Sequence, residues 1–356
     1  MAGQVSDYSG LDRFLHRLAF AGGMVQKAAA DIEDAMFAKV VASGNAIAPI
    51  FVTSLPRAGT TVLLTALASL QTLASHTYRD MPFVMAPMLW SRLSGGFQKD
   101  SGLKERAHGD GVKVGYDSPE AFEEVFWRAF WPHKFTDTGI GLWTESDADA
   151  EATAFFRKHL AKIVTLRCGT GVGQGRYISK NNANIARLDL IPAMFPDARI
   201  LVPVRSPMAH AASLMRQHHN FLERHGSDAF TKRYMRDIGH LEFGELHRPI
   251  QFPGFAARAQ SLSPEVLDYW LAYWIAAFEY VKEHRERVAL VSHEAICNDA
   301  LATVRNLFTA LGIEAAEQER AVAAHFRPGP ENNRPFPDHD LALRAEAEAL
   351  YADLIG

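Results

Sequence analysis

Short apolar runs alternate along this chain with longer stretches in which apolar residues recur every three or four positions. The short runs predict buried strands at residues 50–52, 72–76, 200–204 and 288–291. The longer stretches predict helices at residues 10–43, 119–133, 150–166, 184–195, 264–285, 299–312 and 341–354. Because buried strands that alternate with helices favour parallel pairing with right-handed crossovers, we predict an α/β fold in which helices flank a parallel sheet.

We expect one α/β domain at residues 46–356, with helix-rich insertions, preceded by an N-terminal helical segment at residues 1–45. The apolar spacing of this segment, broken at Gly22-Gly23, suits helices that cover the core. The alternative is an arm that joins two copies in a homodimer. Charged residues such as Lys27 interrupt the first long apolar pattern before it reaches the roughly 18 residues of a membrane span, so we expect none.

Composition narrows the function classes. The net charge of −4 argues against nucleic-acid binding through bulk positive charge. The two cysteines, Cys168 and Cys297, are too few for a disulfide framework, and neither stands in a metal-ligand spacing. We therefore expect both thiols to be reduced, the protein to be cytoplasmic and no metal to be bound.

The most informative segment is residues 49–67, in which a short apolar strand enters a tight turn and then an apolar helix. This arrangement directs backbone N–H groups and the positive end of a helix dipole at one point. Arg57 adds a fixed charge, Gly59 allows close backbone approach, and Thr60 and Thr61 add hydroxyl donors. The segment predicts a P-loop-like pocket for a tetrahedral oxyanion such as phosphate or sulfate.

A second polar element follows the strand at residues 200–204. Arg205 stands at the C-terminal end of that strand, where open α/β sheets bind ligands. Pro207 suits the first turn of the next helix, and Ser213 lies about two turns along it. An arginine and a serine placed in this way can bind a second phosphate.

The order strand–PRxGTT–helix, then strand–Arg–x7–Ser, resembles the sulfotransferase family that uses 3′-phosphoadenosine 5′-phosphosulfate (PAPS). The resemblance implies that the 5′-phosphosulfate is held by Arg57, Ala58, Gly59, Thr60 and Thr61. It implies that the 3′-phosphate is held by Arg205 and Ser213. Lys180 precedes Arg205 by 25 residues, a spacing similar to that of tyrosylprotein and bacterial members, whose lysine lies near the transferring sulfuryl group.

The chain also departs from the family pattern. Cytosolic members carry serine where Ala58 stands, and a tryptophan that stacks on adenine where Val62 stands. Adenine must therefore be held in another way. The chain is more similar to bacterial and Golgi-type members than to the cytosolic steroid and phenol enzymes.

The resemblance implies in-line transfer of a sulfuryl group from PAPS to a hydroxyl or amine acceptor. Fixed positive charges stabilise the equatorial oxygens and the leaving phosphate in such a step, and Arg57 and Lys180 are the natural pair. No metal is required. A small molecule, a glycan, a lipid and a peptide all remain open as the acceptor.

The general base has three candidates. Family members place a carboxylate about 20 residues beyond the loop arginine, where this chain has His76 and Asp80, 19 and 23 residues beyond Arg57. Asp80 has an alternative role as a helix cap before Pro82. His108, in a glycine-flanked segment, has an ordinary pKa suited to proton transfer, but such a segment is also typical of a surface turn.

Two other function classes remain possible. One is a P-loop nucleotide kinase or hydrolase, although the chain lacks the Gly-Lys-Ser/Thr run of that class. The other is a non-catalytic nucleotide-binding protein on the same fold.

Overall fold

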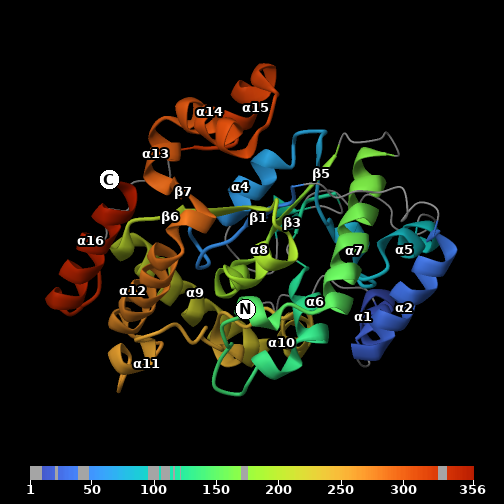
Figure 1. Cartoon of the computed structure of the whole chain (residues 1–356). Helices are drawn as coiled ribbons and strands as arrows, with labels where there is room; N and C mark the ends of the chain where they lie inside the picture. The colour runs from blue at the N-terminus through green and yellow to red at the C-terminus, as the bar shows by residue number, and fades with distance from the viewer. Residues whose placement is uncertain are drawn as a thin grey trace.

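The structure is a computed structural model that describes residues 10–20, 23–38, 48–94, 104–105, 113–114, 117–120, 122–169, 175–327 and 335–356. Its centre is one parallel sheet of five strands in the order β2-β5-β1-β6-β7. The strands are β1 (Ile50–Val52), β2 (Leu73–Ala74), β5 (Arg176–Lys180), β6 (Arg199–Val204) and β7 (Val288–Ser292). The predicted α/β fold is confirmed (Figure 1).

Alternate residues of the central strand β1 enter two different cores. Ile50 and Val52 pack with the core that includes α4 (Thr60–Leu67) and α14 (Ala300–Leu311). Phe51 packs on the opposite face of the sheet, with the larger core. Because side chains of a strand point to opposite faces in turn, this short strand is buried on both sides, as its continuous apolar run predicted.

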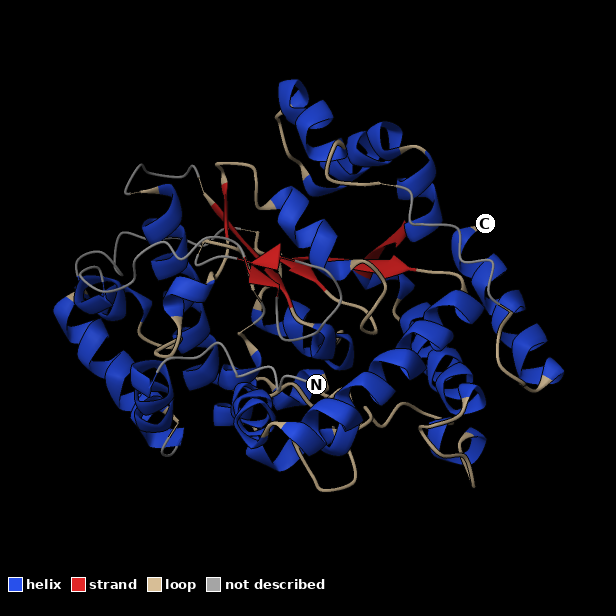
Figure 2. Ribbon diagram, turned by 180° about the vertical axis from the view of Figure 1, so that it is seen from behind, coloured by secondary structure: helices blue, strands red, loops and turns tan. Residues whose placement is uncertain are grey.

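Helices therefore cover both faces of the sheet (Figure 2). The smaller core is completed by α13 (His293–Asn298) and α15 (Glu319–Ala323). The larger core involves α6 (Glu124–Phe130), α7 (Ala150–Cys168), α8 (Leu190–Met194), α9 (Pro207–Ser227), α10 (Ala229–Ile238), α11 (Phe255–Arg258), α12 (Leu267–Glu283) and α16 (Leu341–Ile355). A small antiparallel pair, β3 (Lys104–Glu105) with β4 (Lys113–Val114), stands apart from the main sheet.

The N-terminal helices are α1 (Gly10–Ala19) and α2 (Gly23–Met36). The α2 helix packs against α7, where Lys162 Nζ lies 2.9 Å from Glu33 Oε1 in a fully buried ion pair. Glu33 also accepts a hydrogen bond from the backbone N–H of Leu89, in α5 (Pro87–Ser94), at 2.7 Å. These contacts fasten α2 to the α/β domain.

Several expected elements are shorter in the structure, among them the helix expected at residues 119–133, which is reduced to α6, and strand β5 was not expected from the sequence. The helix expected at residues 184–195 is divided into a 3₁₀ segment, Asn182–Arg187, and the short α8. Pro192 lies in the first turn of α8, where a missing N–H is tolerated, so a helix that continued from residue 184 would place this proline in its interior. The strand expected at residues 72–76 is reduced to the two residues of β2.

Across the described residues, none of the helices combines the length and the apolar character that crossing a bilayer requires.

Candidate functional site

The turn between β1 and α4 depends on its backbone conformation and on close packing against His293. Arg57 and Gly59 adopt the left-handed conformation, with φ of 74° and 92°. A Cβ at Gly59 would lie 3.1 Å from the ring of His293, so both the conformation and the close packing favour glycine. Arg57 is not a glycine, and strained conformations of this kind are found at ligand-binding positions.

A carbonyl group of this turn accepts a hydrogen bond from a histidine on the side of the larger core. His210 Nε2, on α9, donates to the carbonyl of Pro56 at 2.7 Å. Trp274 Nε1 donates to His210 Nδ1 at 3.2 Å, which fixes the neutral tautomer of His210. Burial, with a smaller effect of the charges on Arg205 and Arg57, lowers the pKa of His210 to about 3. The histidine therefore acts as an uncharged support of the turn.

The two anion-binding elements predicted from the sequence meet in space. Arg205 Nη1 donates to the carbonyl of Arg57 at 3.1 Å, and Arg57 Nε lies 3.4 Å from Ser213 Oγ. Both elements border one cleft of about 220 Å³ that opens to solvent. The predicted residues that line it are Arg57, Gly59, Thr60, Thr61, Lys180 and Arg205.

Lys180 reaches this cleft because of the strand register. It ends β5 and pairs with Val52, the last residue of β1, so the end of β5 adjoins the start of the turn. Asn182, two residues later, accepts a hydrogen bond from Thr60 Oγ1 at 3.2 Å, and its carbonyl accepts one from Thr53 Oγ1 at 3.0 Å. The end of β5 and the turn are therefore joined into one structure.

The electrostatics of the cleft favour an anionic ligand. Burial is the largest effect on the guanidinium of Arg205 and lowers its pKa. The charge of Glu294 raises this pKa, whereas the charges of Arg57 and Arg216 lower it further. Burial and Arg205 also lower the pKa of His293, which leaves that ring uncharged near neutrality. An anion with several charges would relieve the repulsion among these arginines.

A second, much smaller cavity of about 30 Å³, with room for a few water molecules at most, adjoins the cleft. The residues that line both are Pro56, Lys180, Asn182, His240, Glu242 and Phe243. The rest of the lining of the second cavity combines apolar side chains, such as Ile140, Leu214 and Trp270, with the charged side chains of Glu124 and Arg248.

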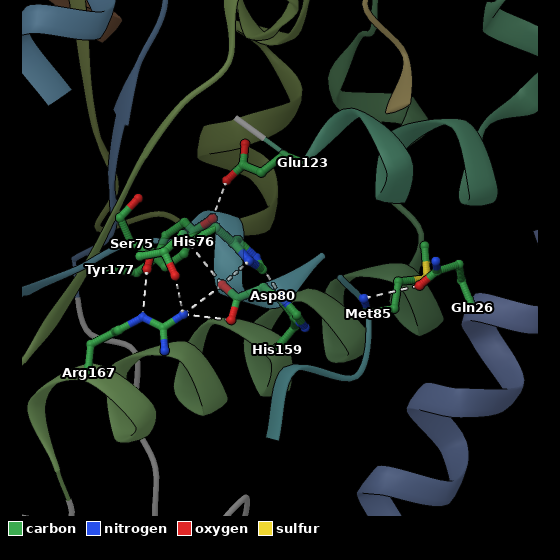
Figure 3. Close-up of polar contacts among 10 residues, drawn as sticks. Gln26, Ser75, His76, Asp80, Met85, Glu123, His159, Arg167 and Tyr177 are labelled. Carbon is green, nitrogen blue, oxygen red and sulfur yellow. Dashed lines mark hydrogen bonds and ion pairs between the residues drawn. The ribbon is translucent and has the colours of Figure 1, made fainter. Parts of the chain in front are cut away.

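Asp80 and His76 lie in a buried network and line neither of these two cavities (Figure 3). Arg167, on α7, donates to both oxygens of Asp80 at 2.6 and 2.7 Å, and His76 Nδ1 lies 3.1 Å from Asp80 Oδ2. The backbone N–H of Thr77 donates to Asp80 at 2.9 Å within a 3₁₀ capping box at Tyr78–Asp80. Burial raises the pKa of Asp80, but hydrogen bonding and charge from His76 and the charge of Arg167 outweigh it, and the pKa is lowered.

The remaining predicted residues are placed as follows. Ala58 is buried inside the turn, and Ser213 is 8% exposed on α9. His108 lies outside the described residues. Within those residues, no three or more His, Cys, Asp or Glu side chains gather in a way that would hold a metal ion.

Sequence reasoning missed Asn182, Glu242, His210 and His293. The pair Asn181-Asn182 directly after a buried strand was a usable signal, because polar residues at strand ends face the ligand edge of a parallel sheet. Glu242 and His210 had no comparable signal, since each reaches the site only through tertiary packing.

Comparisons with known proteins agree with this geometry. The model of the sulfotransferase family matches residues 49–251, more than half of the chain, and includes the turn, Lys180, Arg205 and Ser213. A search of curated proteins gives no match.

Two solved structures share the fold. Sulfotransferase STF1 from Mycobacterium tuberculosis H37Rv is similar with a TM-score of 0.50 and 15% identity, over 99% of this chain and 88% of that one. Sulfotransferase STF9 from Mycobacterium avium gives 0.50 and 12%, over 99% and 87%. On the strength of the family match, this chain belongs to the sulfotransferase family.

Proposed function

We propose that this protein transfers a sulfuryl group from PAPS to a hydroxyl or amine acceptor by in-line displacement. The observation that carries the proposal is the convergence of the 57–61 turn, Lys180 and the Arg205–Ser213 element on one cleft. PAPS presents an anionic group at each end of its ribose, so two joined anion sites suit it better than they suit a simple phosphate.

The roles follow from position and charge. Arg57, the hydroxyl of Thr61 and the backbone N–H groups of Thr60 and Thr61 at the N-terminus of α4 bind the 5′-phosphosulfate, because these residues line the cleft together. Arg205 and Ser213 bind the 3′-phosphate. Lys180, at the boundary of the cleft and the second cavity, stabilises the sulfuryl oxygens and the leaving phosphate as charge develops on them.

Calorimetry tests the donor. We expect the protein to bind adenosine 3′,5′-bisphosphate (PAP) at least tenfold more tightly than ATP without added magnesium. Magnesium-dependent binding of ATP, with no binding of PAP, would instead support the kinase or hydrolase alternative.

Transfer of label from [35S]PAPS then tests catalysis. The wild type and Lys180→Ala are compared in an extract that supplies acceptors, with Lys158→Ala, an exposed lysine of α7, as the matched control. Tight PAP binding with no transfer in any fraction would support the non-catalytic alternative. The cytoplasmic location and the homodimer stay predictions.

A further inference from the structure

The second cavity has two chemically different ends. At one end it meets the cleft at Lys180, Asn182, His240 and Glu242. At the other end its walls come from buried apolar residues of α9 and α12, which include Leu214, Trp270 and Tyr273. The cavity is too small for the body of an acceptor, so an acceptor hydroxyl would reach Lys180 and Glu242 from the cleft.

Glu242 is the carboxylate that both cavities share. Its Oε1 accepts a hydrogen bond from Asn182 Nδ2 at 3.3 Å, and its Oε2 lies 3.8 Å from His240 Nδ1. Its side chain is 27% exposed, whereas that of Asp80 is 2% exposed. A carboxylate with access to the cleft can take up a proton there, and one enclosed by Arg167 and His76 cannot.

The other acidic residue that lines this cavity, Glu124, is paired with an arginine. Glu124 forms two hydrogen bonds with Arg187, at 2.7 and 3.1 Å, and accepts a third from Asn181 at 2.7 Å. Its carboxylate lines the cavity but is held in an ion pair with Arg187. Glu242, by contrast, accepts its hydrogen bond from the neutral amide of Asn182.

The backbone of Glu242 is held in place by neutral histidines. His247 Nδ1 donates to the carbonyl of Glu242 at 2.6 Å, and its Nε2 accepts from Tyr269 at 2.7 Å. His218 Nδ1, on α9, accepts from the backbone N–H of Gly244 at 3.2 Å. Burial lowers the pKa of both His218 and His247 to about 4, so both rings stay uncharged near neutral pH.

We propose that Glu242 is the general base for an acceptor whose hydroxyl binds in the cleft, where the cleft meets the second cavity beside Lys180. This inference rests on the proposed sulfuryl transfer. The acceptor oxygen forms a bond to sulfur while the bond from sulfur to the bridging phosphate oxygen breaks, and that electron pair leaves with PAP. The acceptor proton passes to Glu242.

Kinetic variants test the base. We compare Glu242→Gln and Glu242→Asp with Glu245→Gln, a surface residue of the same segment paired with Lys232. The assay follows [35S]PAPS transfer to 2-naphthol and to the fraction of a cell extract below about 1 kDa. We expect kcat of Glu242→Gln to fall about 10²–10⁴-fold and its acid limb in the pH profile to disappear. PAP affinity should change less than twofold, Glu242→Asp should recover part of the rate, and Glu245→Gln should match the wild type.

Other outcomes separate the two proposals. If the wild type transfers sulfate and Glu242→Gln keeps kcat within threefold, or His240→Asn removes the acid limb instead, Glu242 is not the base, although the sulfotransferase function stands. If Glu242→Gln loses PAP affinity and thermal stability together, its role is structural. If the wild type does not bind PAP, the proposed function itself fails.

Discussion

The segments that follow β1 and β2 lie at the same edge of the sheet, yet they use their charged residues in opposite ways. After β1, Arg57 and Gly59 border an open cleft together with Lys180. After β2, Asp80 is enclosed by Arg167 and His76 and is 2% exposed. A polar residue at a strand end is thus a ligand-binding candidate only when tertiary partners leave it accessible.

The closed network should control stability. Arg167→Ala leaves the carboxylate of Asp80 buried without its guanidinium, so we expect the free energy of unfolding to fall by about 3–5 kcal/mol. Urea denaturation measures this change, with Arg344→Ala, which breaks an exposed pair with Glu348, as the control. An unchanged free energy of unfolding would contradict the structural role of the segment after β2. Loss of PAP affinity in the folded variant would contradict its separation from the cleft.

The histidines behind the cleft should make stability depend on pH. The pKa of His218 is about 4 in the folded protein and about 6.5 in the unfolded chain, so the unfolded state binds more protons between these values. The stabilising effect is therefore complete above pH 6.5 and declines as the pH falls toward 4, by about 3 kcal/mol for this residue.

Denaturation curves from pH 7 to pH 4 measure this decline. His218→Asn keeps an acceptor near the Nδ1 position but cannot be protonated, so its decline should be smaller than that of the wild type. Equal slopes for the two proteins would show that His218 does not titrate in this window.

The open cleft should control turnover. Lys180→Ala removes a charge next to the proposed reacting group, so we expect kcat to fall by the equivalent of about 2–3 kcal/mol, roughly 30–150-fold. PAP affinity should change by less than about threefold. Steady-state kinetics and calorimetry together measure this split, and an equal loss in both quantities would assign Lys180 to ground-state binding instead.

Loss of Arg205 should weaken PAP binding rather than turnover. The effect should be somewhat smaller than that of Lys180→Ala, because Ser213 also contacts the proposed 3′-phosphate. We expect Arg205→Ala to weaken PAP binding by about 1.5–2 kcal/mol, roughly 10–30-fold, with kcat at saturating PAPS little changed. Calorimetry with PAP measures the loss. A fall in kcat with a constant Kd would give Arg205 the role proposed for Lys180. The assignment of the 3′-phosphate site would then be wrong.

Local patterns were sufficient for the turn and for four of the five strands, but β5 (Arg176–Lys180) was not predicted. Strands such as β1 and β6 are continuous apolar runs bounded by polar residues, and the turn carries its chemistry in consecutive residues. The Arg205–Ser213 pair was also readable, because both residues belong to one strand–helix unit.

Contacts between distant segments could not be predicted from the sequence in this way. Asp80 stood at a plausible spacing, but its partner Arg167 comes from α7, 87 residues later. Glu242 reaches the edge of the cleft through packing of its segment against α9 and α12, and periodicity says nothing about such packing. Burial and accessibility, which separate these two carboxylates, are properties of the assembled fold.

The amide of Asn182 joins the two ends of the site. Its oxygen accepts from Thr60, at the start of α4, and its nitrogen donates to Glu242. An aspartate of the same shape would lose the donor, and a leucine would lose both contacts. One side chain therefore links the N-terminus of α4 to the proposed general base.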